Sequence, residues 1–125
     1  MNPNLRVIGV QSGAAQAAYR SWQAHQLLQD TMDTFAEGLA TRSAFELPQR
    51  ILWDKLDDFV LVSDAEIRQS ILWMIEKTHN LVEAAGAAPL AAAVRMREDL
   101  SGKRVALVCS GGNISPPQLR DVLTA

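Results

Sequence analysis

The 125-residue sequence has 48% hydrophobic and 21% charged residues, proportions typical of one globular domain and unlike those of disordered or fibrous chains. A net charge of −2, with the basic residues scattered along the chain, argues against nucleic-acid binding. The lone Cys109 cannot form an internal disulfide, and no apolar run approaches the roughly 20 residues that span a bilayer. Since Met1-Asn2-Pro3-Asn4 also lacks the pattern of a secretion signal, we expect a cytoplasmic protein that binds neither nucleic acid nor membranes.

Short apolar runs over residues 5–10, 59–62 and 105–109 predict three β-strands. They are rich in Val, Ile and Leu, and Arg6 is the single charge among them, as in strands of parallel sheets that are covered on both faces. The segments between them have helical periodicity. This alternation predicts a single three-layer αβα domain over residues 1–125, with a short, mainly parallel sheet of about three strands and helices on both faces.

Helices are expected over residues 13–28 and 44–55, on either side of a polar stretch. The clearest helix start follows the second strand, where Ser63-Asp64-Ala65-Glu66 forms a capping box. In such a box the serine hydroxyl and the glutamate carboxylate each accept a hydrogen bond from a backbone N–H that the helix leaves unpaired. Residues 67–75 then place isoleucines and a leucine on one face.

The next helical segment, over residues 84–97, consists mostly of alanine. Pro89 lacks a backbone N–H and is best tolerated in a first helical turn, so we expect the regular helix to begin near Ala88. The small side chains would allow this helix to pack very close to a sheet.

A turn rich in serine and glycine, Ser110-Gly111-Gly112-Asn113, follows the third expected strand and precedes a short helix. Ligands of open α/β folds bind at the carboxyl ends of parallel strands, where glycines let the backbone approach them closely. From the residues alone, an ordinary turn is the simpler interpretation.

The turn resembles the Ser-Gly-Gly-Asn signature that closes the cofactor site of fold-type II pyridoxal-phosphate enzymes of the threonine dehydratase and serine racemase family. The similarity continues in the expected order over residues 2–123, which implies equivalence to the C-terminal part of the large domain of such an enzyme. In one block Glu37 stands where the family usually has aspartate. The matching blocks are residues 7–10 with 18–21, 35–40, 57–67, 82–88 and 105–113.

The resemblance implies a role for each matched position of the cofactor site. The Ser110 hydroxyl would face the pyridine nitrogen as a neutral partner, and Glu83 would lie near the cofactor ring. The backbone at Gly38 would line the same pocket, which Gly111, Gly112 and Asn113 complete. Without the resemblance, Glu83 would be a solvated carboxylate at a helix start and Gly38 an ordinary turn residue.

Two family features have no counterpart in this sequence. The family has a lysine that forms the Schiff base and a run of glycines that holds the phosphate. Here Lys55, Lys77 and Lys103 lie beside polar or charged residues, as solvated lysines do. The resemblance therefore implies a truncated enzyme domain without catalytic residues of its own, inactive alone, which binds pyridoxal phosphate weakly or not at all. The alternatives are a stand-alone protein-interaction or oligomerisation module, which binds a protein partner instead of a cofactor, and one half of a split ammonia-lyase that needs a complementing N-terminal half.

No metal site is expected. Serine-racemase-like members bind a divalent ion through carboxylates at positions where this chain has Gln11 and Ala17, and hard cations prefer charged oxygens. His25 and His79 have no further metal ligands at suitable spacing and are expected at solvated helix positions.

The sequence has three tryptophans, Trp22, Trp53 and Trp73. They are most simply core residues, although exposed tryptophans favour interfaces. We expect a homodimer or larger assembly.

Overall fold

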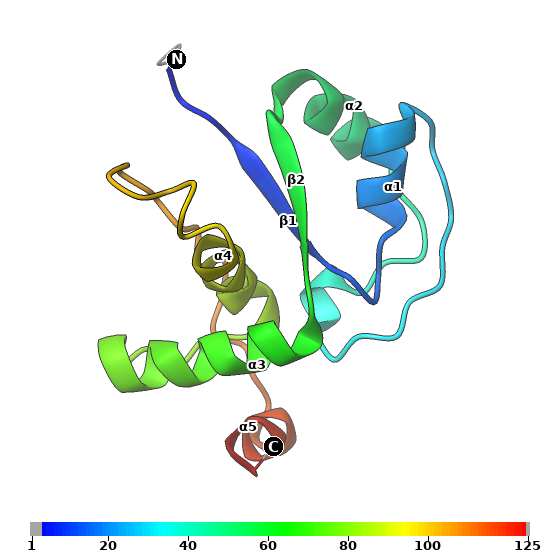
Figure 1. The fold of residues 1–125 in the computed structure, drawn as a ribbon. Coiled ribbons are helices and arrows are strands. Elements are labelled where there is room, and N and C mark those ends of the chain that lie inside the picture. Colours follow the sequence, from blue (N-terminus) through cyan, green and yellow to red (C-terminus); the bar gives the residue numbers. More distant parts are fainter. Residues whose placement is uncertain (1–3, 125) are drawn as a thin grey trace.

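Two parallel strands form the centre of the fold in the computed structural model, which describes residues 4–124 (Figure 1). They are β1 (Ile8–Ser12) and β2 (Asp58–Val62), paired in register from Ile8 opposite Asp58 to Ser12 opposite Val62. The other elements, in chain order, are α1 (Ala17–Ala24), the 3₁₀ turn Glu37–Leu39, α2 (Glu46–Lys55), α3 (Asp64–Trp73), the π-helical turn Met74–Thr78, α4 (Ala84–Arg95) and α5 (Pro116–Thr124).

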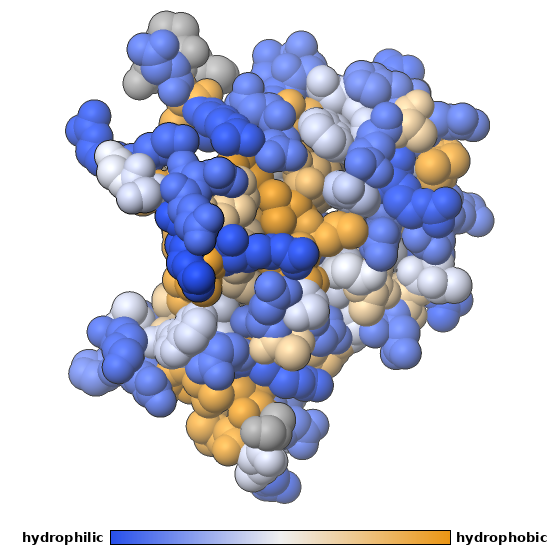
Figure 2. All heavy atoms as spheres, viewed as in Figure 1, coloured by the Kyte–Doolittle hydropathy of each residue, from blue (hydrophilic) through white to orange (hydrophobic). Residues whose placement is uncertain are grey.

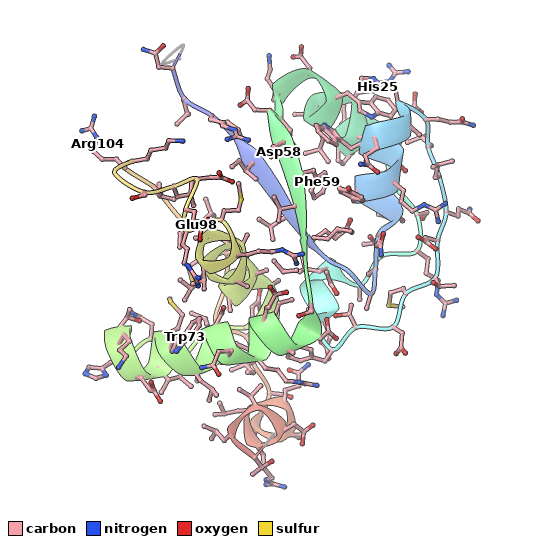
Figure 3. The ribbon with its side chains drawn as sticks, viewed as in Figure 1. His25, Asp58, Phe59, Trp73, Glu98 and Arg104 are labelled. Atoms are coloured by element: carbon pink, nitrogen blue, oxygen red, sulfur yellow. The ribbon has the colours of Figure 1, made fainter. Side chains whose placement is uncertain are left out.

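Helices cover both sides of the two strands, which confirms the predicted α/β class with its layered arrangement. Helix α4 packs against both strands, whereas α1 contacts β2 from the other side and carries α2 with it (Figure 1). Phe59 points from β2 toward α1, where Tyr19 and Trp22 meet its ring edge-on at centroid distances of 5.7 and 6.0 Å (Figure 3). The main core lies on the α4 side, around the fully buried Ile67 and Ile71 of α3.

The prediction of a third paired strand, over residues 105–109, is wrong. Residues 105–109 have no regular secondary structure, and the sheet has two strands among the described residues. The segment lies against α4, since a Cβ atom added to Gly86 would be 3.5 Å from the Cys109 sulfur. Because a strand needs a neighbour for its hydrogen bonds, an apolar run alone does not form one.

Helix α4 begins four residues earlier than the sequence predicted, at Ala84 instead of near Ala88. The Ala87 N–H already donates to the Glu83 carbonyl at 3.1 Å, and Pro89 lies inside the helix. Five of its alanines, together with Gly86, are buried against the core. Burial of this face outweighs the backbone hydrogen bond that the proline removes.

Two tryptophans join α1 to α2. The Trp22 indole N–H donates to the Leu52 carbonyl at 3.2 Å, and the Trp53 indole N–H donates to the Ser21 carbonyl at 3.0 Å. Helix α1 ends at Ala24, short of the expected residue 28, because His25 adopts a left-handed conformation with φ of 50° and stacks on the Trp53 ring. Both indoles are therefore engaged within the chain.

The capping box at the start of α3 forms as predicted. The Ser63 N–H donates to Glu66 Oε2 at 2.7 Å, and the Glu66 N–H donates to Ser63 Oγ at 3.2 Å. Partial burial raises the pKa of the Glu66 carboxyl, but the hydrogen bonds from Ser63 and the charge of Arg95 outweigh it. The pKa therefore lies below its ordinary value.

The lowered pKa of Glu66 makes its contribution to stability depend on pH. A carboxyl whose pKa is lower in the folded state stabilises the fold above its ordinary pKa, 4.5, and loses this effect as pH falls through the folded value. We expect Glu66→Gln to lower the free energy of unfolding near pH 7 and to have a much smaller effect near pH 3, as measured by urea titration at both. A difference that stays constant over this range would contradict the expectation.

Much of the surface is polar, but apolar residues gather in two places on the face that Figure 2 shows, over the strands beside α4 and over α5. Val10 and Val60, which pack beside the core, are only partly buried. The sheet face next to α4 is thus incompletely covered by the described residues. No helix among residues 4–124 combines the length and apolar character needed to cross a membrane.

Candidate functional site

A cavity of about 320 Å³ lies where the start of α4, the 3₁₀ turn and the segment before α5 meet. Three of the predicted cofactor-binding residues, Gly38, Glu83 and Asn113, line it. These residues come from segments far apart in the sequence, which α4 brings together. The remaining lining residues are Phe35, Glu37, Ala84, Ala85, Ile114 and Gln118.

Glu83 is the residue before the first turn of α4, where a carboxylate is favoured by the helix dipole. Its backbone N–H donates to the Gly111 carbonyl at 3.1 Å. Its side chain lies directly over Gly111, because a Cβ atom added there would be 2.8 Å from Glu83 Oε1 and 3.0 Å from Cδ. Glycine at position 111 is what allows this carboxylate to lie against the turn.

The Ser110–Asn113 turn is pressed against the chain around the start of α4 at two further points. A Cβ atom on Gly86 would lie 2.8 Å from the Gly111 carbonyl oxygen, and one on Gly112 would lie 2.8 Å from the Leu81 carbonyl oxygen. On the opposite wall, a Cβ atom on Gly38 would lie 2.8 Å from that of Ala85. Glycines at these positions therefore allow close contacts beside the cavity.

The predicted site residues are thus neighbours, but not all of them line the cavity. Ser110 is exposed, and neither its hydroxyl nor its backbone hydrogen-bonds to any of residues 4–124. Gly111 lies behind Glu83, and Gly112 is exposed in the same turn. The structure brings the turn to Glu83, and the roles of these residues toward a cofactor stay predictions.

The sequence reasoning missed Gln118 and a role for Glu37. The Gln118 side-chain amide donates to Glu37 Oε1 at 2.9 Å, which joins α5 to the 3₁₀ turn across the cavity. Its amide oxygen accepts hydrogen bonds from the Ser115 N–H at 3.1 Å and hydroxyl at 3.2 Å. Ser115-Pro116-Pro117-Gln118 has the serine and glutamine spacing of a capping box, followed by proline in the first turn, so this signal was present in the sequence.

The charges of the cavity are negative. Glu37 and Glu83 line it, and no lysine or arginine does among the described residues. Lys55 pairs with Asp54, and Lys77 lies 3.9 Å from Glu76. Among the described residues, this lining offers no cation for a phosphate and no amine for an aldehyde.

A cation does lie one side chain away from the cavity. Arg68 of α3 stacks on the ring of Phe35 at 3.9 Å from its centroid. Its Nη1 atom is buried and has no hydrogen-bond partner among residues 4–124. The guanidinium supports the back of one cavity wall and does not reach the lining.

Gln11, at one of the positions where no metal ligand was expected, forms a hydrogen bond within the chain. The buried Gln11 accepts a hydrogen bond from the Tyr19 N–H at 3.0 Å, which fixes the loop between β1 and α1. Within residues 4–124, no three histidine, cysteine or acidic side chains come together as potential metal ligands.

Comparison with known proteins agrees with this fold. The family model described as pyridoxal-phosphate dependent enzyme matches residues 1–111, and this chain belongs to that family. It is 43% identical over 115 residues to the L-threonine ammonia-lyase of Geobacter sulfurreducens, covering 90% of this chain and 28% of that protein. It is 32% identical over 113 residues to the serine racemase of Schizosaccharomyces pombe, covering 90% of this chain and 35% of that protein.

The backbone is also shared with solved structures of this family. The processed form of threonine deaminase isoform 2 from Solanum lycopersicum superposes with a TM-score of 0.87 at 27% identity, over 97% of this chain and 36% of that one. The expected resemblance to threonine dehydratases and serine racemases is confirmed. The chain spans about a third of the length of the relatives it matches, for example 28% of one and 36% of another.

Proposed function

We propose that this chain forms the ring-facing wall of a pyridoxal-phosphate site of the serine or threonine ammonia-lyase type, equivalent to the C-terminal part of such an enzyme. The observation that carries the proposal is the Glu83 carboxylate held over Gly111 beside a cavity that Gly38 and Asn113 also line. When bound, the cofactor supplies the electron sink for elimination. Ser110 provides a neutral hydroxyl for the pyridine nitrogen, and Glu83 lies at the ring.

We also propose that the chain is inactive alone. A pyridoxal-phosphate lyase needs an amine in the pocket and cationic or N–H donors for the phosphate. The lysines Lys55, Lys77 and Lys103 are exposed and line no part of the cavity. Activity therefore requires a polypeptide that supplies these groups, as in a split enzyme. The isolated chain binds the cofactor weakly or not at all.

A chimeric enzyme tests whether the wall is functional. The chain would replace the matched 115-residue segment of the G. sulfurreducens threonine ammonia-lyase, and threonine deamination would be measured. We expect an active chimera in which Gly111→Ala lowers kcat/KM at least about tenfold, because the new Cβ displaces the Glu83 carboxylate. Glu83 is a flexible side chain, so the variant should still fold.

Gly13→Ala is the matched control, since a Cβ atom there would meet its nearest neighbour, the Val62 carbonyl oxygen, at an ordinary 3.6 Å. It should leave kcat/KM close to that of the chimera. A folded chimera with no activity, or one in which both glycine variants behave alike, would contradict the proposed wall.

A second candidate is an interaction module that forms homo-oligomers without a cofactor. The observation in its favour is a set of exposed apolar side chains at α2, namely Phe45, Leu47 and Ile51. Contiguous exposed apolar surface often marks a protein interface. Sedimentation of the wild-type chain and of Leu47→Lys tests this candidate function. If it is right, the wild-type chain sediments as a dimer and the Leu47→Lys variant as a monomer.

A further inference from the structure

Two carboxylates without a cationic partner line the cavity, those of Glu37 and Glu83. Neither forms an ion pair with a described residue, and no described lysine or arginine lies in the lining. Behind Phe35, the Arg68 guanidinium stacks on the ring, and the Asp64 carboxylate accepts from the Phe35 N–H at 3.2 Å. These two charges are opposite and offset each other, so the two glutamates determine the sign of the charge in the cavity.

Glu37 is held in the lining by a donor whose orientation the chain fixes. The Gln118 amide oxygen accepts hydrogen bonds from the Ser115 N–H and hydroxyl, so its NH₂ group is directed the other way and donates to Glu37 Oε1 at 2.9 Å. A flipped amide would set its NH₂ group against the Ser115 N–H, which is also a donor. Gln118 therefore keeps the Glu37 carboxylate in one place and leaves its Oε2 without a hydrogen bond from any described residue.

The cavity is small enough for both charges to act on any group within it. Its volume is about 320 Å³. A sphere of that volume is about 8 Å across, which is no more than the Debye length of about 8 Å at physiological ionic strength. A negatively charged group is therefore repelled by Glu37 and Glu83 wherever it lies in the cavity, whereas a neutral group is not.

We propose that Glu37, positioned by Gln118, makes the site select against 2-amino-3-hydroxy acids whose side chain carries a carboxylate. 3-Hydroxyaspartate is the matched case, because it has a carboxylate where threonine has a methyl group. The proposal rests on the proposed function, since it concerns the substrate that lies against the same wall. A like charge weakens binding of the charged substrate and leaves the neutral one unaffected, so the effect is on selectivity.

Calorimetric titration of the chimeric threonine ammonia-lyase that contains this chain tests the selectivity without turnover. The ligands are 2-aminobutyrate and aspartate, which are threonine and 3-hydroxyaspartate without the hydroxyl that would leave as water. Glu37→Gln should raise the affinity for aspartate relative to 2-aminobutyrate at least about fivefold, because it removes one negative charge and keeps the size of the side chain. The ratio of the two affinities cancels any loss that affects both ligands alike.

Gln118→Glu should lower the same ratio by about twofold or more, because it adds a carboxylate to the lining. Glutamate still offers oxygen acceptors to Ser115, as in an ordinary capping box, so the start of α5 is retained. A merely structural role of Gln118 would not move the ratio. Glu98→Gln is the matched control and should leave the ratio unchanged, since this exposed carboxylate follows α4 at the end opposite Glu83 (Figure 3).

An affinity ratio that is the same with and without Glu37→Gln, or that Glu98→Gln raises equally, overturns the proposed selectivity. If the chimera nevertheless deaminates threonine, the proposed wall stands and only the selectivity fails. A chimera that neither deaminates threonine nor binds 2-aminobutyrate overturns both.

Discussion

Replacing Gly86 by alanine is expected to lower the free energy of unfolding by up to about 2 kcal/mol, although alanine is the better helix former. The helix propensity gained is about 1 kcal/mol, whereas inserting a methyl group into a closed contact costs about 1 to 3 kcal/mol. The new Cβ would lie 2.8 Å from the Gly111 carbonyl oxygen and 3.3 Å from the Gly111 nitrogen. Backbone atoms cannot rotate away as a side chain can, so the turn itself must move.

Urea titration and amide hydrogen exchange measure this effect. The Glu83 N–H, which donates to the Gly111 carbonyl, should exchange faster in Gly86→Ala. In Gly13→Ala, where the added Cβ meets nothing closer than 3.6 Å, the protection of Glu83 should not change. A Gly86→Ala variant that is more stable than the wild type would show that α4 and the turn are not in close contact.

Removing the Asp64 carboxylate is expected to have the largest effect on stability, about 3 kcal/mol. Its Oδ1 accepts hydrogen bonds from the Ser12 hydroxyl at 2.9 Å and from the Thr34 hydroxyl at 2.7 Å, and its Oδ2 accepts from the Phe35 N–H at 3.2 Å. Hydrogen bonds to a charged group contribute about 1.5 to 3 kcal/mol each and are not additive. Asp64→Ala also leaves the hydroxyl of the fully buried Ser12 without this acceptor.

Asp64→Asn separates the two oxygens of the carboxylate. Its amide oxygen can still accept from Ser12 and Thr34, but its NH₂ group would face the Phe35 N–H, so an intermediate loss is expected. Asp121→Ala is the control, since the side chain of this exposed aspartate of α5 forms no hydrogen bond or ion pair with another described residue, and the substitution should change stability by less than about 0.5 kcal/mol. Equal losses for Asp64→Ala and Asp121→Ala would contradict this account of the carboxylate.

The parts of the fold that the sequence predicted well are those that neighbouring residues decide. The capping box between Ser63 and Glu66 needs only four consecutive residues, and the strand at Phe59 is marked by its own apolar run. The start of α4 was misjudged because the local effect of Pro89 is outweighed by burial of alanines, which depends on a distant core.

Other features depend on contacts between distant segments. A paired strand at 105–109 was expected from its composition, but pairing requires a neighbour that residues 4–124 do not supply. The hydrogen bond from Gln118 to Glu37 joins residues 81 positions apart, which no local pattern reveals. The neighbourhood of Glu83, Gly111 and Asn113 was expected only from the family resemblance, since their separate patterns indicate a helix start and an ordinary turn.

Incubating the purified chain with pyridoxal phosphate and serine or threonine examines the whole account at once. If the cavity beside Glu83 is one wall of a site whose amine comes from another polypeptide, the isolated chain forms no 2-oxoacid from either amino acid. Deamination by the isolated chain, with the cofactor fixed to Lys55, Lys77 or Lys103, would contradict it.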